Sequence, residues 1–428
     1  MQPLGLIYNG GKRQYAAQIV ENIKADAPNA LYFCDIFGGG GSVFCAAKKA
    51  GFKTFYNDFQ GDLANLLRAA AFDGAALKYA VVAGMLEKFI TFDDFHALKA
   101  NYQKDAQRIL TDDFFSVEKA HAFFQVLGNS FSSQMGSYLY ARDRCDFYAD
   151  FHNMIFKKDA AALERVKANY DFHFNAFFES AFFELIKPAP ALFDLENFYH
   201  AVWRPFYAAG GHVEFLHKRG LHNAPSFSSG KPWSALTFKE FLSVPKCAVA
   251  ALAGAQKQEA TRFASDYFLR ARALFHVIDF LSAQNFERRK MHLYFSNADW
   301  RDFVEKMLGF FKANGIPLNK VVFYADPPYK DSANGAYCVF KGLGRSKSKR
   351  NKDIETIFNH AAFLEYIKSA APAVRVYFSE FGDFPQFRRV WQKAKTTYLG
   401  ANKYKRVDFL YSNSAEPEPF ELKFCLAA

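Results

Sequence analysis

The sequence contains no long apolar run. No stretch of its 428 residues approaches the roughly 18 to 20 consecutive apolar residues that a membrane-spanning helix needs. The opening segment, MQPLGLIYNGG, lacks the basic region followed by an apolar region that marks a secretory signal. These absences exclude a membrane protein and a secreted one, and we expect a cytoplasmic protein.

Cysteine is scarce and scattered. The six cysteines include no CxxC pair, and the 11 histidines form no cluster with them at the spacing of a zinc site. We therefore expect free thiols in a reducing compartment and no metal site.

Acidic residues are outnumbered by basic ones. The chain has 54 Lys and Arg against 43 Asp and Glu, a net charge of +11, which favours a polyanion as a partner. Hydrophobic residues make up 50% of the chain, so a disordered protein is excluded. Phenylalanine alone accounts for 51 residues; most of these rings should fill a core, and some can stack on bases. The length suggests two to three domains of about 150 residues each.

The first sixty residues alternate between helical and strand patterns. Residues 12–24 repeat apolar side chains at helical spacing, and residues 30–37 form a short, mostly apolar run typical of a buried strand. Four glycines, 38–41, separate this strand from a second helix at 42–51, and another strand follows at 52–59. This order predicts the opening of a doubly wound α/β domain.

The pattern changes after residue 75. The chain is mostly helical and aromatic up to about residue 289, with an apolar helical stripe over 267–281. Strand patterns return near 293 and at 321–325, and we expect a helix at 354–370, a strand at 374–378 and a closing hairpin built from TTYLGA and VDFLYSN. The prediction is one α/β domain formed by residues 1–75 and 290–428 and divided by a helical insertion at 76–289.

A glycine-rich turn follows the first strand, in CDIFGGGGSVF. Glycines there allow a backbone turn to approach a ligand closely, although the run also suits a plain tight turn. Asp35 ends the first strand, and Asp58 ends the second, where an acid binds ribose hydroxyls in nucleoside-cofactor folds. The alternative for Asp58 is a helix cap or a turn residue. The run is not a Walker A loop, because the Gly-Lys-Ser/Thr is missing.

The strongest motif is Asp326-Pro327-Pro328-Tyr329, directly after the apolar strand 321–325. Two prolines end the hydrogen-bond ladder and stiffen the chain at the carboxyl edge of the sheet, where ligands bind in open α/β folds. The acid and the carbonyl of Pro327 can accept hydrogens from an exocyclic amine, and Tyr329 can stack on a flat base. A weaker motif, Tyr8-Asn9-Gly10-Gly11-Lys12, precedes the first helix and also suits an ordinary turn.

The order of these motifs resembles the Dam-like, alpha-group (D12 class) DNA adenine-N6 methyltransferases. The resemblance covers roughly residues 1–75 and 290–428, and it departs from the family pattern where Asn9 replaces Ala and Ile36 replaces Pro. It implies a Rossmann-like, S-adenosylmethionine-dependent methyltransferase fold. It also implies transfer of a methyl group to N6 of a flipped-out adenine, by direct in-line displacement, with Asp326, Pro327, Pro328 and Tyr329 as catalytic residues.

The same resemblance implies a cofactor site. The residues expected to bind S-adenosylmethionine are Tyr8, Gly10, Gly11, Lys12, Asp35, Phe37, Gly39, Gly41, Ser42, Asp58 and Asp326. Asn297 and Asp299 are weaker candidates near the adenine of the cofactor, or else ordinary loop residues.

Three segments are candidates for DNA contact. They are a segment of the insertion with Asn129, Gln134, Arg142 and Arg144, a basic segment after the proline motif with Arg345, Lys347, Lys349 and Arg350, and a basic hairpin with Lys403, Lys405 and Arg406. A packing role for the first segment and a solvated loop for the second are the alternatives.

The expected partner is double-stranded DNA, and a cognate restriction enzyme is a further candidate. A bacterial or phage-type, nucleoid-associated enzyme fits this assignment. Methylation of structured RNA, and a catalytically silent nucleic-acid-binding protein on the same scaffold, stay open. The target sequence and the oligomeric state do not follow from the sequence.

Overall fold

The structure is a computed structural model, and it divides the chain into two compact units. One, the sheet unit, comprises Met1–Gly74, Asp105–Phe123 and His276–Ala428, and the other, the helical unit, comprises Ala75–Lys104 and Phe124–Phe275. The sheet unit thus includes 105–123 and 276–289, which we had placed in the insertion. The residues described are 3–7, 11–105, 114–130, 137–139, 145–157, 159, 161–162, 165, 270–271, 273–328, 358–370, 374–380, 383–399 and 402–416.

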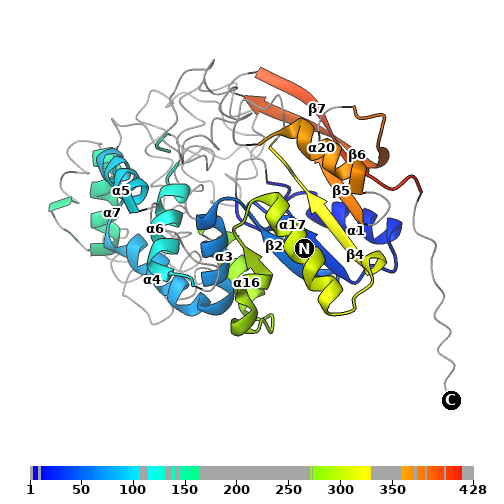
Figure 1. Ribbon diagram of the computed structural model, residues 1–428. Helices are drawn as coiled ribbons and strands as arrows, with labels where there is room; N and C mark the ends of the chain where they lie inside the picture. Colours follow the sequence, from blue (N-terminus) through cyan, green and yellow to red (C-terminus); the bar gives the residue numbers. More distant parts are fainter. Residues whose placement is uncertain are drawn as a thin grey trace, which may run out of the picture. The chain divides into compact units, whose positions relative to one another are not determined.

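A seven-stranded mixed sheet forms the centre of the sheet unit (Figure 1). Its strand order is β3-β2-β1-β4-β5-β7-β6, with β1 to β5 parallel and β7 antiparallel to both neighbours. The strands are β1 (Tyr32–Asp35), β2 (Lys53–Asn57), β3 (Phe295–Ser296), β4 (Val321–Ala325), β5 (Arg375–Glu380), β6 (Arg388–Leu399) and β7 (Asn402–Ser412).

The strand order reverses between β1 and β4. These two strands pair in parallel, with Tyr32 beside Val321 and Asp35 beside Tyr324. Their carboxyl ends therefore coincide at one edge, and Asp326 follows β4 there. In open α/β sheets such a reversal point leaves a crevice in which ligands bind.

Helices cover both faces of the sheet. The helices α1 (Ala16–Asp26) and α2 (Ser42–Lys49) pack through a cluster that includes Ile19, Phe33 and Tyr324. The opposite face packs through a second cluster against α17 (Trp300–Ala313) and α20 (His360–Ala370). Because both faces of β4 are covered, all five of its residues are buried, which explains its continuous apolar sequence.

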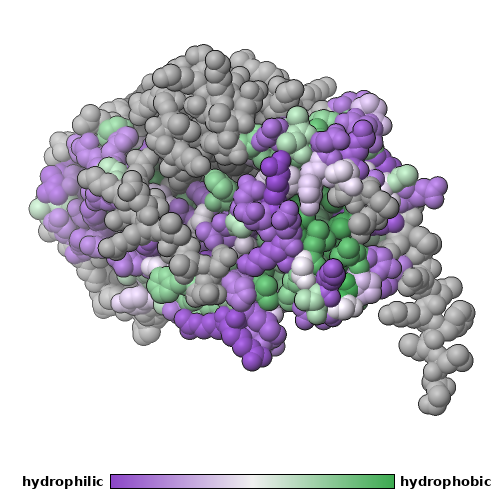
Figure 2. Space-filling view, in the orientation of Figure 1, coloured by the Kyte–Doolittle hydropathy of each residue, from purple (hydrophilic) through white to green (hydrophobic). Residues whose placement is uncertain are grey.

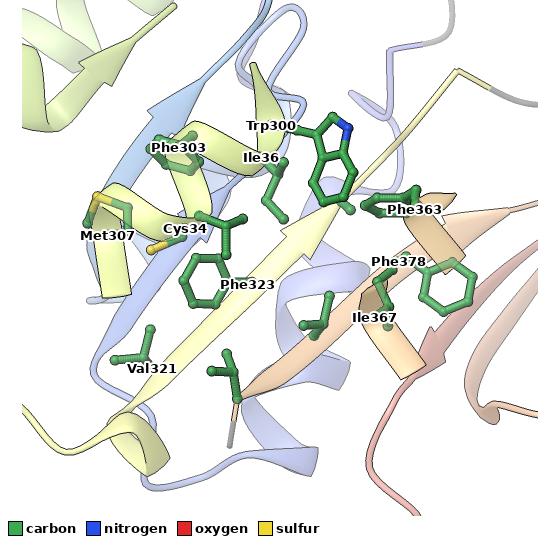
Figure 3. Close-up of a cluster of buried hydrophobic side chains, with 14 of the residues drawn as sticks. Cys34, Ile36, Trp300, Phe303, Met307, Val321, Phe323, Phe363, Ile367 and Phe378 are labelled. Atoms are coloured by element: carbon green, nitrogen blue, oxygen red, sulfur yellow. The ribbon is translucent and has the colours of Figure 1, made fainter. Parts of the chain in front are cut away.

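The second cluster is rich in aromatic side chains (Figure 3). Phe323 of β4, Phe303 of α17 and Phe363 of α20 are fully or almost fully buried in it, and the rings of Trp300 and Phe363 meet edge to face with centroids 5.1 Å apart. Between α17 and α20 this core contains a small apolar pocket whose lining includes Trp300 and Ile367. Figure 2 shows that the coloured part of this face is mostly hydrophilic and that it includes an area of apolar residues.

The helical unit is held by side chains that satisfy backbone carbonyls. Its helices are α4 (Gly74–Glu87), α5 (Phe92–Asp105), α6 (Val117–Gly128) and α7 (Cys145–Lys157), of which α4, α5 and α6 extend partly into the sheet unit's segments. The buried Arg270 donates from one guanidinium nitrogen to the carbonyls of Gly128 and Ser130, both at 2.7 Å. Tyr138 donates to the carbonyl of Ile90. The Arg270 contacts lie at the end of α6, whereas the Tyr138 contact lies just before α5.

Four elements differ from the sequence-based expectation. The helix expected from residue 12 begins at Ala16, because the backbone N–H groups of Tyr15 and Ala16 both donate to the carbonyl of Lys12 and form a turn first. The strand expected near 293 begins at Phe295, as β3, because residues 291–294 form the short helix α16; a brief apolar run does not distinguish helix from strand. The helix α17 was not anticipated, and β6 begins at Arg388, eight residues before the expected hairpin strand.

We expect Phe323→Ala to destabilise the protein by about 3–5 kcal/mol, because the truncation leaves a cavity in the cluster of Figure 3. Leu31→Ala is the matched control, since Leu31 is 53% exposed and its truncation should change the free energy of unfolding by less than about 0.5 kcal/mol. Urea unfolding followed by circular dichroism measures both, and equal losses in the two variants would contradict the assigned core.

Candidate active site at the carboxyl edge of the sheet

A buried ion pair joins the first and last sequence motifs. Nζ of Lys12, just before α1, lies 2.7 Å from Oδ1 and 2.9 Å from Oδ2 of Asp326, just after β4. The Lys12 side chain is 5% exposed and that of Asp326 is 18% exposed. The structure therefore brings YNGGK and DPPY together at the reversal point of the sheet.

The prolines after Asp326 are described, but the tyrosine is not. Pro327 is buried and Pro328 is half-buried, and neither has an N–H to continue the ladder of β4. Gly11, next to Lys12, is half-buried. Three predicted site residues, Tyr8, Gly10 and Tyr329, lie outside the described residues.

The glycine run forms a tight turn between β1 and α2. The N–H of Gly38 donates to the carbonyl of Asn57, and the N–H of Gly41 donates to the carbonyl of Gly38, both at 2.8 Å. A Cβ on Gly38 would lie 2.1 Å from the ring of Tyr56, and Gly41 has a φ of +72°. Side chains at these positions would displace the turn, so glycine is required there for close packing and for conformation.

Phe37, predicted to lie beneath the cofactor, is part of the packing around α20. Its half-buried ring meets Phe358 and Phe363 edge to face, with centroids 5.3 and 5.5 Å away. These contacts connect the beginning of the glycine turn to the core on that face of the sheet.

Asp58 connects the end of β2 to the glycine turn. Its Oδ2 accepts from the N–H of Gly39 and its Oδ1 from the N–H of Gln60, both at 2.8 Å. Burial raises the pKa of Asp58 to about 6, while the two N–H donors act in the opposite direction. Each carboxylate oxygen keeps a second lone pair, so the position is compatible with binding a ligand hydroxyl as well.

Some buried polar atoms at this edge receive no hydrogen bond from the described residues. Oδ1 of Asp35, at the end of β1, and Oγ of Ser42, at the start of α2, are both buried without a hydrogen bond from the described residues. Burial, with the charges of Asp326 and Asp58, raises the pKa of Asp35 well above its usual range, against the backbone N–H of Phe44. Unpaired buried groups are costly and mark places where a ligand can supply the partner.

Asn57 and Arg68 support the site and were not singled out from the sequence. The Asn57 amide donates to the carbonyl of Ile36 at 3.0 Å, and its oxygen accepts from the N–H of Ala298 at 2.9 Å, which joins the loops after β1 and β3. Arg68 of α3 (Gly61–Phe72) is fully buried and donates to the carbonyl of Phe295 at 2.6 and 3.0 Å. The sequence signal that could have identified Arg68 is a lone arginine within the apolar helix sequence LANLLRAAAF.

The weaker cofactor candidates lie after β3. Arg68 also approaches Oδ1 of Asn297, at 3.5 Å, so Asn297 is held near the edge of the sheet. The carboxylate of Asp299 accepts from the N–H of Arg301 at 2.9 Å and caps α17. The contact gives Asp299 a structural role.

The predicted DNA contacts are only partly described. Asn129 is buried at the end of α6, where its amide donates to the carbonyl of Gln125 at 2.8 Å. Lys403, Lys405 and Arg406 lie on β7, in the part of the β6–β7 ribbon that extends beyond its pairing with β5. The remaining candidates, Gln134, Arg142, Arg144, Arg345, Lys347, Lys349 and Arg350, lie outside the described residues.

Searches of the described residues for a metal site and for a membrane span are negative. No group of three His, Cys, Asp or Glu side chains there is arranged to hold a metal ion. Within the same residues, no helix combines the length and the apolar character needed to cross a bilayer.

Residues 8–167, a stretch shorter than half of the chain, match the family model of the D12 class N6 adenine-specific DNA methyltransferases. The match contains Lys12, the glycine turn and Asp58, whereas Asp326 and its prolines lie beyond it. The mixed seven-stranded sheet with helices on both faces agrees with the α/β methyltransferase fold that this family implies. A search of the curated proteins finds no match to the chain.

We expect the Lys12–Asp326 pair to be strongly coupled. A double-mutant cycle with Lys12→Met and Asp326→Asn should give a coupling free energy of about 1–3 kcal/mol, because the pair is partly desolvated and both carboxylate oxygens accept from the ammonium. The matched control is the more exposed Lys88–Asp94 pair, also close at 2.8 Å, which should give less than about 1 kcal/mol. Equal coupling free energies in the two cycles would show that burial does not strengthen the Lys12–Asp326 interaction.

Proposed function

We propose that this chain, whose residues 8–167 match the model of the D12 class N6 adenine-specific DNA methyltransferases, belongs to that family and methylates N6 of a flipped-out adenine by direct displacement. The observation that carries the proposal is the contact between Lys12 and Asp326. It joins the carboxylate of the proline motif to the lysine before α1, at the sheet edge where open α/β folds bind ligands.

The family implies S-adenosylmethionine as the methyl donor, and the residues at this edge suit it. Gly38 and Gly39 of the glycine turn are half-buried, and Asp35 and Ser42 each hold a buried oxygen without a hydrogen bond from the described residues. We assign Asp35 and Ser42 to the polar groups of the donor and Asp58 to its ribose hydroxyls. Lys12 and Gly11 line the same space from the entrance to α1.

Asp326 orients the nucleophile. The adenine N6 lone pair is delocalised into the ring, and hydrogen bonds from its two hydrogens to Asp326 and to the Pro327 carbonyl favour a pyramidal nitrogen. When bound, the donor supplies a methyl carbon on a sulfonium, which is open to attack in line. Lys12 offsets the charge of Asp326 in the free enzyme, and its contact must be shared or released as the amine enters. Positioning and electrostatics then supply most of the rate enhancement.

A base within a duplex cannot reach a carboxylate at the edge of this sheet. We therefore propose base flipping, which costs a few kcal/mol of stacking and pairing. Stacking on the ring of Tyr329 would recover about 1–3 kcal/mol of that cost. The two prolines between Asp326 and Tyr329 restrict the backbone that joins these two residues.

We assign catalysis to the sheet unit and target recognition to the helical unit. Within the sheet unit, the β6–β7 ribbon carries five basic residues in the segment 393–408: Lys393, Lys395, Lys403, Lys405 and Arg406. The part of the ribbon beyond Glu380, the last residue of β5, extends past the same carboxyl edge that holds Asp326. The DNA phosphates next to a flipped base would then lie close to this part of the ribbon.

Purified protein with labelled S-adenosylmethionine should label N6 of adenine in duplex DNA, as seen by digestion to nucleosides and chromatography. Asp326→Ala should reduce the rate at least about a hundredfold while DNA binding is kept, because the acceptor that orients the amine is lost. Asp383→Ala, at a carboxylate that is 71% exposed, is the control and should keep full activity. Label found only in RNA, or normal turnover by Asp326→Ala, would refute the assignment.

Replacing Lys403, Lys405 and Arg406 with glutamine should weaken binding to all DNA sequences alike. The slope of log K against log salt should fall by about 0.9 for each phosphate contact removed. The control replaces three lysines at the opposite edge of the sheet, Lys24, Lys312 and Lys320, and should leave the slope unchanged. Fluorescence anisotropy over a salt series measures both, and identical slopes would exclude the ribbon from the interface.

A further inference from the structure

Asp35 lies at the centre of the sheet's carboxyl edge. It pairs in register with Tyr56 of β2 on one side and with Tyr324 of β4 on the other, and its side chain is 1% exposed. Its Oδ1 has no hydrogen-bond partner among the described residues, although a buried carboxylate normally collects several.

The groups that face Asp35 are mostly acidic or neutral. Asp58 lies after β2 and Asp326 after β4, and both charges act on Asp35. Lys12 offsets the charge of Asp326. The charge of Asp35 also acts on the thiols of Cys34 and Cys45 and on the phenol of Tyr324. Burial raises the pKa of all three groups, so they stay neutral.

A carboxylate in this position lacks the interactions that would keep it charged. It has one backbone donor, the N–H of Phe44, while burial and two neighbouring acids favour its protonated form. A ligand that brings positive charge into the same space would reverse this balance, because the ion pair would form in a buried site of low dielectric. The methyl donor carries a sulfonium and an ammonium group and is such a ligand.

We propose that Asp35 holds a proton in the free enzyme and releases it to solvent when the cationic methyl donor binds. The proposal rests on the proposed function, which supplies the ligand. In this reaction the O–H bond of the Asp35 carboxyl breaks, the proton leaves to water, and the carboxylate that remains pairs with the bound cation. Asp35 is then the residue that links donor affinity to pH.

The linkage has a defined sign. Below the pKa of Asp35 in the free enzyme, donor affinity should rise by up to about tenfold for each unit of pH, and above that pKa the dependence should vanish. Stability of the free enzyme follows the opposite direction. Because the folded-state pKa is raised, the contribution of Asp35 to stability is fully present below its unfolded pKa and is lost as pH rises through the folded value.

Titration calorimetry with S-adenosylmethionine tests the proposal on the full-length protein. Binding heats in two buffers of different ionisation enthalpy give the number of protons released. The wild type should release up to one proton more than Asp35→Asn, whose side chain has a similar shape and cannot ionise. The ligand's own amino group contributes equally to both and cancels in the difference. Asp302→Asn, which removes an exposed carboxylate on α17, should release as many protons as the wild type.

The outcomes separate the two proposals. Equal proton release by the wild type and Asp35→Asn, with donor binding intact, would overturn the role of Asp35 and leave the methyltransferase assignment standing. Absence of donor binding to the wild type would overturn both. If Asp35→Asn does not fold, difference infrared spectroscopy of the wild type decides, since donor binding should remove a carboxylic acid C=O band; an unchanged band would overturn the proposal.

Discussion

The site depends on one buried contact between groups that are 314 residues apart in sequence. The ammonium of Lys12 donates to both oxygens of Asp326, and this joins the entrance of α1 to the end of β4. Desolvation of two charges is costly, and the bidentate geometry offsets part of that cost. Because α1 packs on the sheet face beside β1 and β4, any shift of the helix would alter the position of Asp326, and the core therefore determines the geometry of the acid.

The carboxyl edge of the sheet contains buried polar groups that receive no hydrogen bond from the described residues. Asp58 uses both oxygens to hold the glycine turn and Gln60, whereas Asp35 and Ser42 keep atoms without partners. Such unsatisfied groups lower stability, and the aromatic clusters on the two faces provide compensating burial. Functional sites typically contain such unsatisfied polar groups, because these groups bind the ligand at a cost in stability.

The high aromatic content has a mainly structural explanation. Phe37, expected beneath the cofactor, packs its ring against Phe358 and Phe363, and the face opposite α1 is built from rings of β4, α17 and α20. Figure 3 shows Phe303, Phe323 and Phe363 packed between α17, α20 and the sheet. Within the described residues, phenylalanine rings thus mainly fill the core, while the ring assigned to stacking is that of Tyr329.

The α/β class, the glycine turn and the edge positions of Asp35, Asp58 and Asp326 could be predicted from local patterns in the sequence, namely short apolar strands followed by glycines, acids or prolines. Which side chains meet could not be predicted in this way. Lys12 joins Asp326, Arg68 holds the carbonyl of β3, and Asp299 caps a helix. Such contacts depend on strand order and register, which bring distant residues together and leave no trace in local spacing.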